Sequence, residues 1–244
     1  MVKTLLISLF FSLTSCGVYN LEISISNPLD GINVLKYFAK KDSKVAKIKQ
    51  CQIEIDHKNW SKAVDLCSKL NLEKASNAAL YASALLGKNG GNVFSLIKAA
   101  QDPSSDSDSL IESFITTLGE SDQDAIDELE TAIVLLEGIS NKTSNQYFQL
   151  AYVQFVLAAT IINIEATANG HEGTVEAADI EGMSVTDLDA FYDAISDANT
   201  NLAYSGVSGD ISEQIDEIFS TDLSGWTGWN ETAKETALKS LFGL

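Results

Sequence analysis

Apolar side chains recur at helical spacing along most of the chain beyond residue 30. The first two stripes flank the polar segment 57–59 and comprise Val45, Ile48, Cys51 and Ile55, then Trp60, Ala63, Val64 and Cys67. Such spacing predicts two short amphipathic helices joined by a tight turn, an αα-hairpin.

Further helical segments follow in the rest of the chain. They are 78–86, 93–100, 110–118, 125–136, 147–164, 188–202, 211–219 and 231–242. A glycine-containing loop is expected over 169–183, and the helix after it should end near Gly206. No segment after residue 30 has a convincing strand period, so the predicted fold class is all-α, either a single right-handed array or an irregular bundle.

The N-terminal segment has the features of a secretory signal. Lys3 precedes the apolar run 5–13, which is too short to span a bilayer. At Leu13-Thr14-Ser15-Cys16 the chain resembles a bacterial lipobox. The resemblance implies that residues 1–15 are removed and that Cys16 carries a diacylglycerol and usually an N-acyl chain. The alternative is an ordinary secretory signal in which Cys16 is incidental.

The lipobox also implies a location in the cell envelope. Gly17 is not the Asp that retains many lipoproteins at the inner membrane, so the resemblance favours the outer membrane, facing the periplasm. Residues 16–29 contain alternating apolar and polar positions and are expected to form an extended, lipidated tether. The all-helical domain is then 30–244.

A weak repeat with a spacing of 33 residues relates the first hairpin to the segment after it, since Cys51 aligns with Ala84 and Val64 with Ile97. With Trp60 three residues before Ala63, residues 43–101 resemble tetratricopeptide hairpins, whose repeat is 34 residues long. The resemblance is incomplete because Cys67 replaces the usual aromatic residue and the repeat proline is absent. A generic helical bundle is the alternative, and 107–244 is expected to be an acidic helical bundle.

Two cysteines of the predicted hairpin are equidistant from its turn. Cys51 and Cys67 lie eight residues on either side of Asn59, so their side chains should face each other across two antiparallel helices. An exported compartment permits a disulfide there. The alternative is a pair of small buried thiols.

The uncharged segment 147–164 reaches the lower length limit for a membrane span. Its internal polar residues and its amphipathic neighbours favour a central helix buried in protein, with membrane insertion as the alternative.

The net charge of −18 argues against a nucleic-acid partner, because phosphate backbones are bound mainly through Lys and Arg. The charge is unevenly placed: residues 1–100 carry 13 Lys and 7 acidic residues, whereas residues 101–244 carry 3 Lys and 27 acidic residues. Such a distribution fits orientation at an anionic membrane or recruitment of a basic partner. Asp189, Asp193 and Asp197 form an acidic stripe on one predicted helix, and a solvated face is its default interpretation. A divalent cation could relieve the repulsion between these carboxylates, although no cation-binding motif is present.

Little else in the sequence points to chemistry. His57 and His171 are isolated in predicted turns and are expected to be solvated loop residues, so no metal site is predicted. The absence of a nucleophile motif favours a protein without catalytic role or cofactor. Trp226 and Trp229 in a glycine-rich turn either cap the core or form an exposed partner surface together with the acidic stripe.

Together these features predict a membrane-anchored, non-catalytic helical lipoprotein that acts as a scaffold or adaptor for another envelope protein. The alternative is a periplasmic solute-binding or transport-associated helical lipoprotein, which would need an apolar pocket between its helices.

Overall fold

The computed structural model describes residues 44–91, 115, 118, 121–171, 173–206, 223 and 225–244. Within these residues every regular element is a helix, which confirms the all-α fold class for this part of the chain. Several predicted segments lie outside the described residues: the signal 1–15, Cys16, the tether 16–29, the helical segments 93–100 and 211–219, and 110–118 apart from residues 115 and 118.

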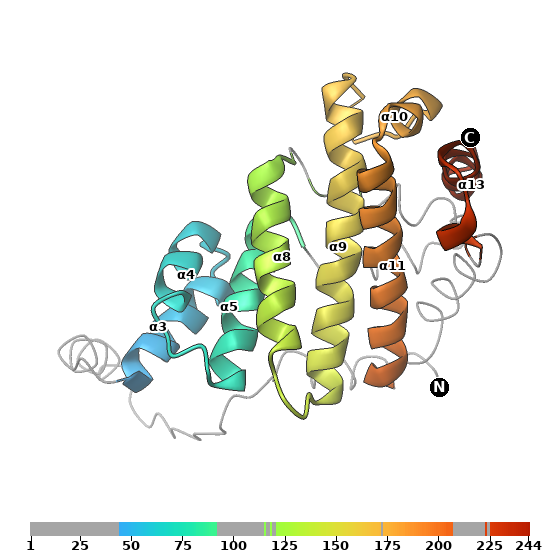
Figure 1. The fold of residues 1–244 in the computed structure, drawn as a ribbon. Coiled ribbons are helices and arrows are strands. Elements are labelled where there is room, and N and C mark those ends of the chain that lie inside the picture. Colours follow the sequence, from blue (N-terminus) through green and yellow to red (C-terminus); the bar gives the residue numbers. More distant parts are fainter. Residues whose placement is uncertain are drawn as a thin grey trace, which may run out of the picture.

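The larger helices stand side by side in chain order (Figure 1). They are α3 (Lys44–Asp56), α4 (Trp60–Cys67), α5 (Ala75–Lys88), α8 (Gln123–Glu137), α9 (Ser144–Ala168) and α11 (Val185–Ser205). The short helix α10 (Ala177–Gly182) lies at the upper end of α9 and α11 in this view, and α13 (Glu231–Leu241), preceded by the short 3-10 helix η1 (Trp226–Gly228), lies beyond α11. The N-terminal hairpin and the C-terminal helix are therefore at opposite ends of the row.

Side-chain caps fix where several helices begin. Asp122, Ser184 and Asn230 each accept a hydrogen bond from a backbone N–H in the first turn of α8, α11 and α13, respectively. Thr143 and Gln146 form a reciprocal capping box at the start of α9. At its other end α11 stops at Gly206, whose φ of 70° is in the left-handed region, as the sequence predicts.

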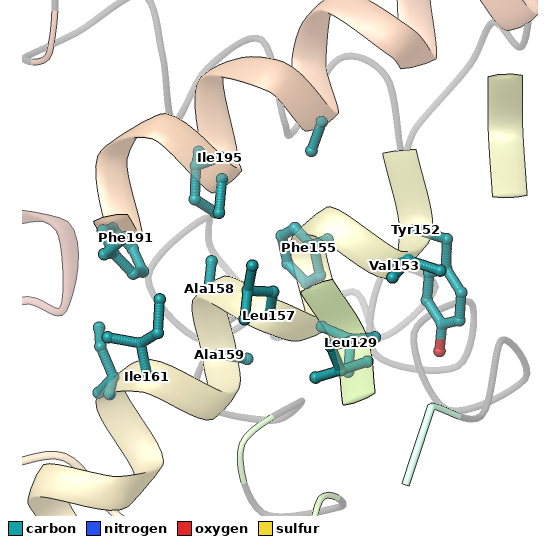
Figure 2. Close-up of a cluster of buried hydrophobic side chains, with 14 of the residues drawn as sticks. Leu129, Tyr152, Val153, Phe155, Leu157, Ala158, Ala159, Ile161, Phe191 and Ile195 are labelled. Carbon is teal, nitrogen blue, oxygen red and sulfur yellow. The ribbon is translucent and has the colours of Figure 1, made fainter. Parts of the chain in front are cut away.

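The core is built around α9, which is enclosed by neighbouring helices. Every residue from Leu150 to Asn163 is buried, which confirms the prediction of a central helix buried in protein. Figure 2 shows Phe191 and Ile195 of α11 directed toward the apolar side chains of α9, with Leu129 of α8 on another side. By length and composition α9 could cross a bilayer, but 78% of its most apolar window is buried inside the protein.

Hydrogen bonds to neighbouring segments accommodate polar side chains of α9. The amide nitrogen of Gln149 donates to the Ala79 carbonyl at 2.8 Å and to Ser83 Oγ at 2.9 Å. Asn163 Nδ2 donates to Ser121 Oγ at 2.9 Å. A buried polar group is costly when it lacks a partner. These hydrogen bonds can form only when α9 has its observed position among its neighbours, so they help to fix that position.

The predicted αα-hairpin is formed by α3 and α4, and the structure joins Cys51 and Cys67 in a disulfide with a Cα–Cα distance of 5.3 Å. Both cysteines are fully buried. Lys58 in the turn has a φ of 57°, and Asn59 donates a hydrogen bond of 2.8 Å to the Glu54 carboxylate. The hairpin is therefore closed covalently at its core and by polar contacts at its turn.

The expectation of a loop over residues 169–183 is wrong in part, because this segment contains the short helix α10. Asp179 accepts from the backbone N–H of Glu176 at 2.7 Å, and the two residues form a capping box. The carboxylate of Asp179, the third residue of α10, thus caps the start of a helix that the weak apolar pattern does not reveal.

Candidate functional site

The predicted partner surface separates into a structural part and an exposed part. Trp226 is 2% exposed, so it caps the core, which is the interpretation that the sequence favours, and the alternative assignment of this residue to an exposed partner surface is wrong. Trp229 is partly buried against the same core. Asp193 and Asp197 are exposed on α11, whereas Asp189 is only half-exposed.

Asp189 is the acceptor in a polar cluster that attaches the C-terminal segment to α11. Trp226 Nε1 donates to Asp189 Oδ1 at 2.8 Å, and Lys234 Nζ of α13 pairs with the same oxygen. The hydrogen bond from Lys234 is the main reason that the pKa of Asp189 is lowered, and the bond from Trp226 adds to it. The Lys234 side chain is 8% exposed, so Asp189 neutralises an otherwise buried charge.

Aromatic stacking completes this cluster. The rings of Tyr192 and Trp226 are stacked with centroids 4.9 Å apart, and Lys234 Nζ lies 5.6 Å from the centre of the Trp226 ring. A second ion pair joins Lys239 of α13 to Glu181 of α10. These contacts explain why a short helix at the chain terminus is held against α10 and α11.

The exposed acids of α11 repel each other. Asp197 lies one turn after Asp193, and its pKa is raised, first because the surrounding protein removes part of its water and second because of the Asp193 charge. These two carboxylates form the part of the predicted surface that remains open to a partner or a cation. Within the described residues, no three His, Cys, Asp or Glu side chains gather closely enough to hold a metal ion.

A second polar cluster lies where α9 ends and α10 begins, around the fully buried Asp179. Its carboxylate accepts hydrogen bonds from Asn169 Nδ2 at 2.8 Å and from His171 Nδ1 at 2.9 Å, in addition to the Glu176 N–H. Burial alone would raise the pKa of Asp179, but these hydrogen bonds outweigh it and the pKa is lowered.

His171 is therefore not a solvated loop residue as expected. Its side chain is 29% exposed, and the hydrogen bond to Asp179 raises its pKa. The other ring nitrogen, Nε2, lies 3.6 Å from Glu176 Oε2. A signal for this cluster does exist in the sequence, since acidic residues at 176 and 179 have the spacing of a capping box. His57, by contrast, is exposed in the turn after α3 as expected.

An open groove of about 640 Å³ runs along α13. It is lined by Trp229, Asn230, Thr232, Ala233, Thr236, Ala237 and Ser240. Hydroxyl groups and small side chains dominate this lining, so it differs from the enclosed apolar pocket that usually holds a small ligand.

Comparison with known proteins gives no match: no family model, no curated protein and no solved structure is similar to this chain. The functional interpretation is therefore based on the residues and their geometry.

Proposed function

We propose that this protein is a lipid-anchored, non-catalytic helical adaptor of the bacterial cell envelope, held at the outer membrane and facing the periplasm. The observation that carries the proposal is the burial of the apolar helix α9 inside the protein. Its apolar surface is covered by neighbouring helices, so we propose that a lipid on Cys16, in the segment that resembles a lipobox, attaches the protein to the membrane. Two or more acyl chains give stable anchoring, whereas one gives only marginal binding.

The disulfide supports export. Cytosolic proteins rarely keep disulfides, because thiols there are held reduced, whereas the periplasm is oxidising. Cys51 and Cys67 are fully buried at the contact between α3 and α4, where a disulfide stabilises a short hairpin.

The adaptor role is supported by the row of helices, which packs around a large apolar cluster and a smaller one in α3, α4 and α5 and leaves charged side chains exposed to a partner. We propose that the part containing α3, α4 and α5 is tetratricopeptide-like, and that the exposed carboxylates Asp193 and Asp197 contribute to the surface that binds an envelope protein. A partner with a basic face would be attracted by these acids.

Crosslinking in the native host tests this function. The detergent-extracted, acylated protein should be recovered with one envelope protein in stoichiometric amount, and D193N/D197N should reduce that recovery. T131A/S140A alters exposed positions of a different surface and serves as the control variant. Recovery of no envelope protein would contradict the adaptor role. Equal recovery with D193N/D197N would contradict the assigned surface.

A second candidate function is carriage of a small solute, and the groove along α13 is its candidate site, although this groove is open and not the enclosed pocket that usually holds a small ligand. Native mass spectrometry of the freshly extracted protein would reveal a bound small molecule. Loss of that molecule in T236V, with retention in T131V on the exposed face of α8, would move the assignment from adaptor to solute carrier.

A further inference from the structure

Charge is separated along the row of helices. The N-terminal part, residues 44–91, contains eight Lys and four acidic residues, and we call it the basic block. The described residues from 121 to 244 contain three Lys and sixteen acidic residues, and we call them the acidic block. Helices α3 and α4 stand at one end of the row, and α11 and α13 stand toward the other (Figure 1). One end of the described structure therefore carries a net positive charge and the other a net negative charge.

The acids of the basic block are partly neutralised at its own surface. Glu54 is paired with Lys62 at 2.6 Å, and Asp65 is paired with Lys69 at 2.7 Å. Further lysines are exposed, and these are Lys47, Lys49, Lys58 and Lys74. The block therefore presents an excess of ammonium groups to anything that approaches this end.

An apolar side chain accompanies these lysines. Val45 is 70% exposed on α3, one helical turn before Lys49. An apolar residue next to lysines suits the boundary between lipid headgroups and acyl chains, where both kinds of group are stabilised. The disulfide and the bond from Asn59 to Glu54 hold α3 and α4 together, so this surface is presented as one unit.

The position of the block along the chain places it nearest the anchor. Residues 17–43 separate Cys16 from α3, and even a fully extended chain of that length reaches only about 100 Å. Attachment through Cys16 alone does not specify which end of the domain meets the bilayer, so the charge of each end contributes to the orientation. An anionic bilayer attracts the basic block and repels the acidic block, and the two forces favour the same orientation.

We propose that the basic block binds the surface of an anionic phospholipid bilayer, so that the anchored protein holds its acidic block away from the membrane. This inference depends on the lipid anchor at Cys16 proposed above. In this orientation the acidic surface of α11 points away from the membrane. It is therefore accessible to a basic partner.

Lysine acetylation of the acylated, full-length mature protein tests the inference. The protein is reconstituted on vesicles of phosphatidylcholine alone or with phosphatidylglycerol, and the rate at each lysine is measured by mass spectrometry. Lys47, Lys58 and Lys74 should react several-fold more slowly on the anionic vesicles, with the protection removed by high salt. Lys142 and Lys239 should react equally on both.

Two charge-matched variants separate location from net charge. K47Q/K74Q removes two positive charges from the basic block, and V134E/T186E adds two negative charges at exposed positions of the acidic block. Each lysine near an anionic surface strengthens adsorption roughly fivefold, so K47Q/K74Q should lose most of the Lys58 protection. V134E/T186E should retain it.

Flotation of the vesicles distinguishes the two proposals. A protein that floats with both kinds of vesicle but shows equal lysine rates would overturn the basic-block proposal and leave the anchor intact. Failure to float with phosphatidylcholine vesicles, together with lysine protection on anionic vesicles, would overturn the anchor and support the basic block. Failure to float with either would overturn both.

Discussion

Replacing Asp189 with alanine should loosen the C-terminal helix from the rest of the protein. The carboxylate accepts from both Trp226 Nε1 and Lys234 Nζ, so one substitution removes the acceptor of an indole N–H and the counter-charge of an ammonium group. Asp193 lies one turn further along the same helix and is exposed. It provides a matched control for removing a carboxylate from α11.

The expected magnitude follows from the unequal burial of the two partners. An exposed ion pair contributes about 0.2–1 kcal/mol, whereas breaking a fully buried pair costs about 3–5 kcal/mol. Here Lys234 is 8% exposed but Asp189 is 44% exposed, so water screens one side of the pair. We therefore expect D189A to lower the free energy of unfolding by about 2 kcal/mol, including about 1 kcal/mol for the indole hydrogen bond.

D189N separates these two contributions, because its amide oxygen can still accept from Trp226. It should cost about 1 kcal/mol less than D189A. D193N should change stability by less than about 0.5 kcal/mol, or raise it slightly, because it relieves repulsion with Asp197.

Thermal unfolding of the lipid-free mature chain carrying Cys16→Ser measures these effects. A loss of about 2 kcal/mol lowers Tm by about 4–8 °C in a domain of this size. Urea unfolding followed by tryptophan fluorescence provides an independent free energy. Equal, small effects of D189A and D193N would refute the reasoning, since the cluster would then contribute no more than an ordinary surface charge.

Three further outcomes are expected. Alanine substitution of both disulfide cysteines should lower the free energy of unfolding by about 3 kcal/mol, because the disulfide closes a loop with a sequence separation of 16. Urea unfolding measures this loss, and unchanged stability would contradict a structural disulfide. A Cβ at Gly87 would lie 2.4 Å from the Trp60 ring, so G87A should be destabilising by about 1 kcal/mol despite the better helix propensity of alanine. G228A is the control and should be nearly neutral in the same assay, because a Cβ at Gly228 meets open space. The pKa of His171 is raised in the folded protein, so its contribution to stability is complete below about pH 6.5 and is lost as the pH rises through the folded pKa. When Tm is measured against pH, H171N should remove this dependence and H57N should not. Identical profiles for wild type and H171N would exclude the contribution.

Helices with a strong local signal could be predicted from the sequence. α4 was expected to begin at Trp60, where its apolar stripe begins after a polar turn, and α11 was expected to end near Gly206. Both expectations are confirmed, because period, turn residues and a C-terminal glycine act within a few residues of each other. The disulfide could be anticipated for the same reason, since two cysteines equidistant from a turn must approach when the hairpin closes.

The candidate site was less predictable because its contacts join distant parts of the chain. Asp189 and Lys234 are far apart in sequence, and their charges alone gave no reason to pair them rather than expose them. His171 and Asp179 are nearer, but the weak apolar pattern of this segment hid α10, so the residues that surround the buried carboxylate were assigned to solvent.

The sequence by itself determined the all-helical class, the N-terminal hairpin with its two facing cysteines and the charge asymmetry. Each of these depends on spacing within a short segment or on composition. Tertiary structure alone decided which apolar and charged groups meet solvent. Lys234 is buried because α13 packs against α11, and His171 meets Asp179 because α10 packs against the end of α9. Burial depends on what lies opposite a side chain in space, which local spacing does not encode.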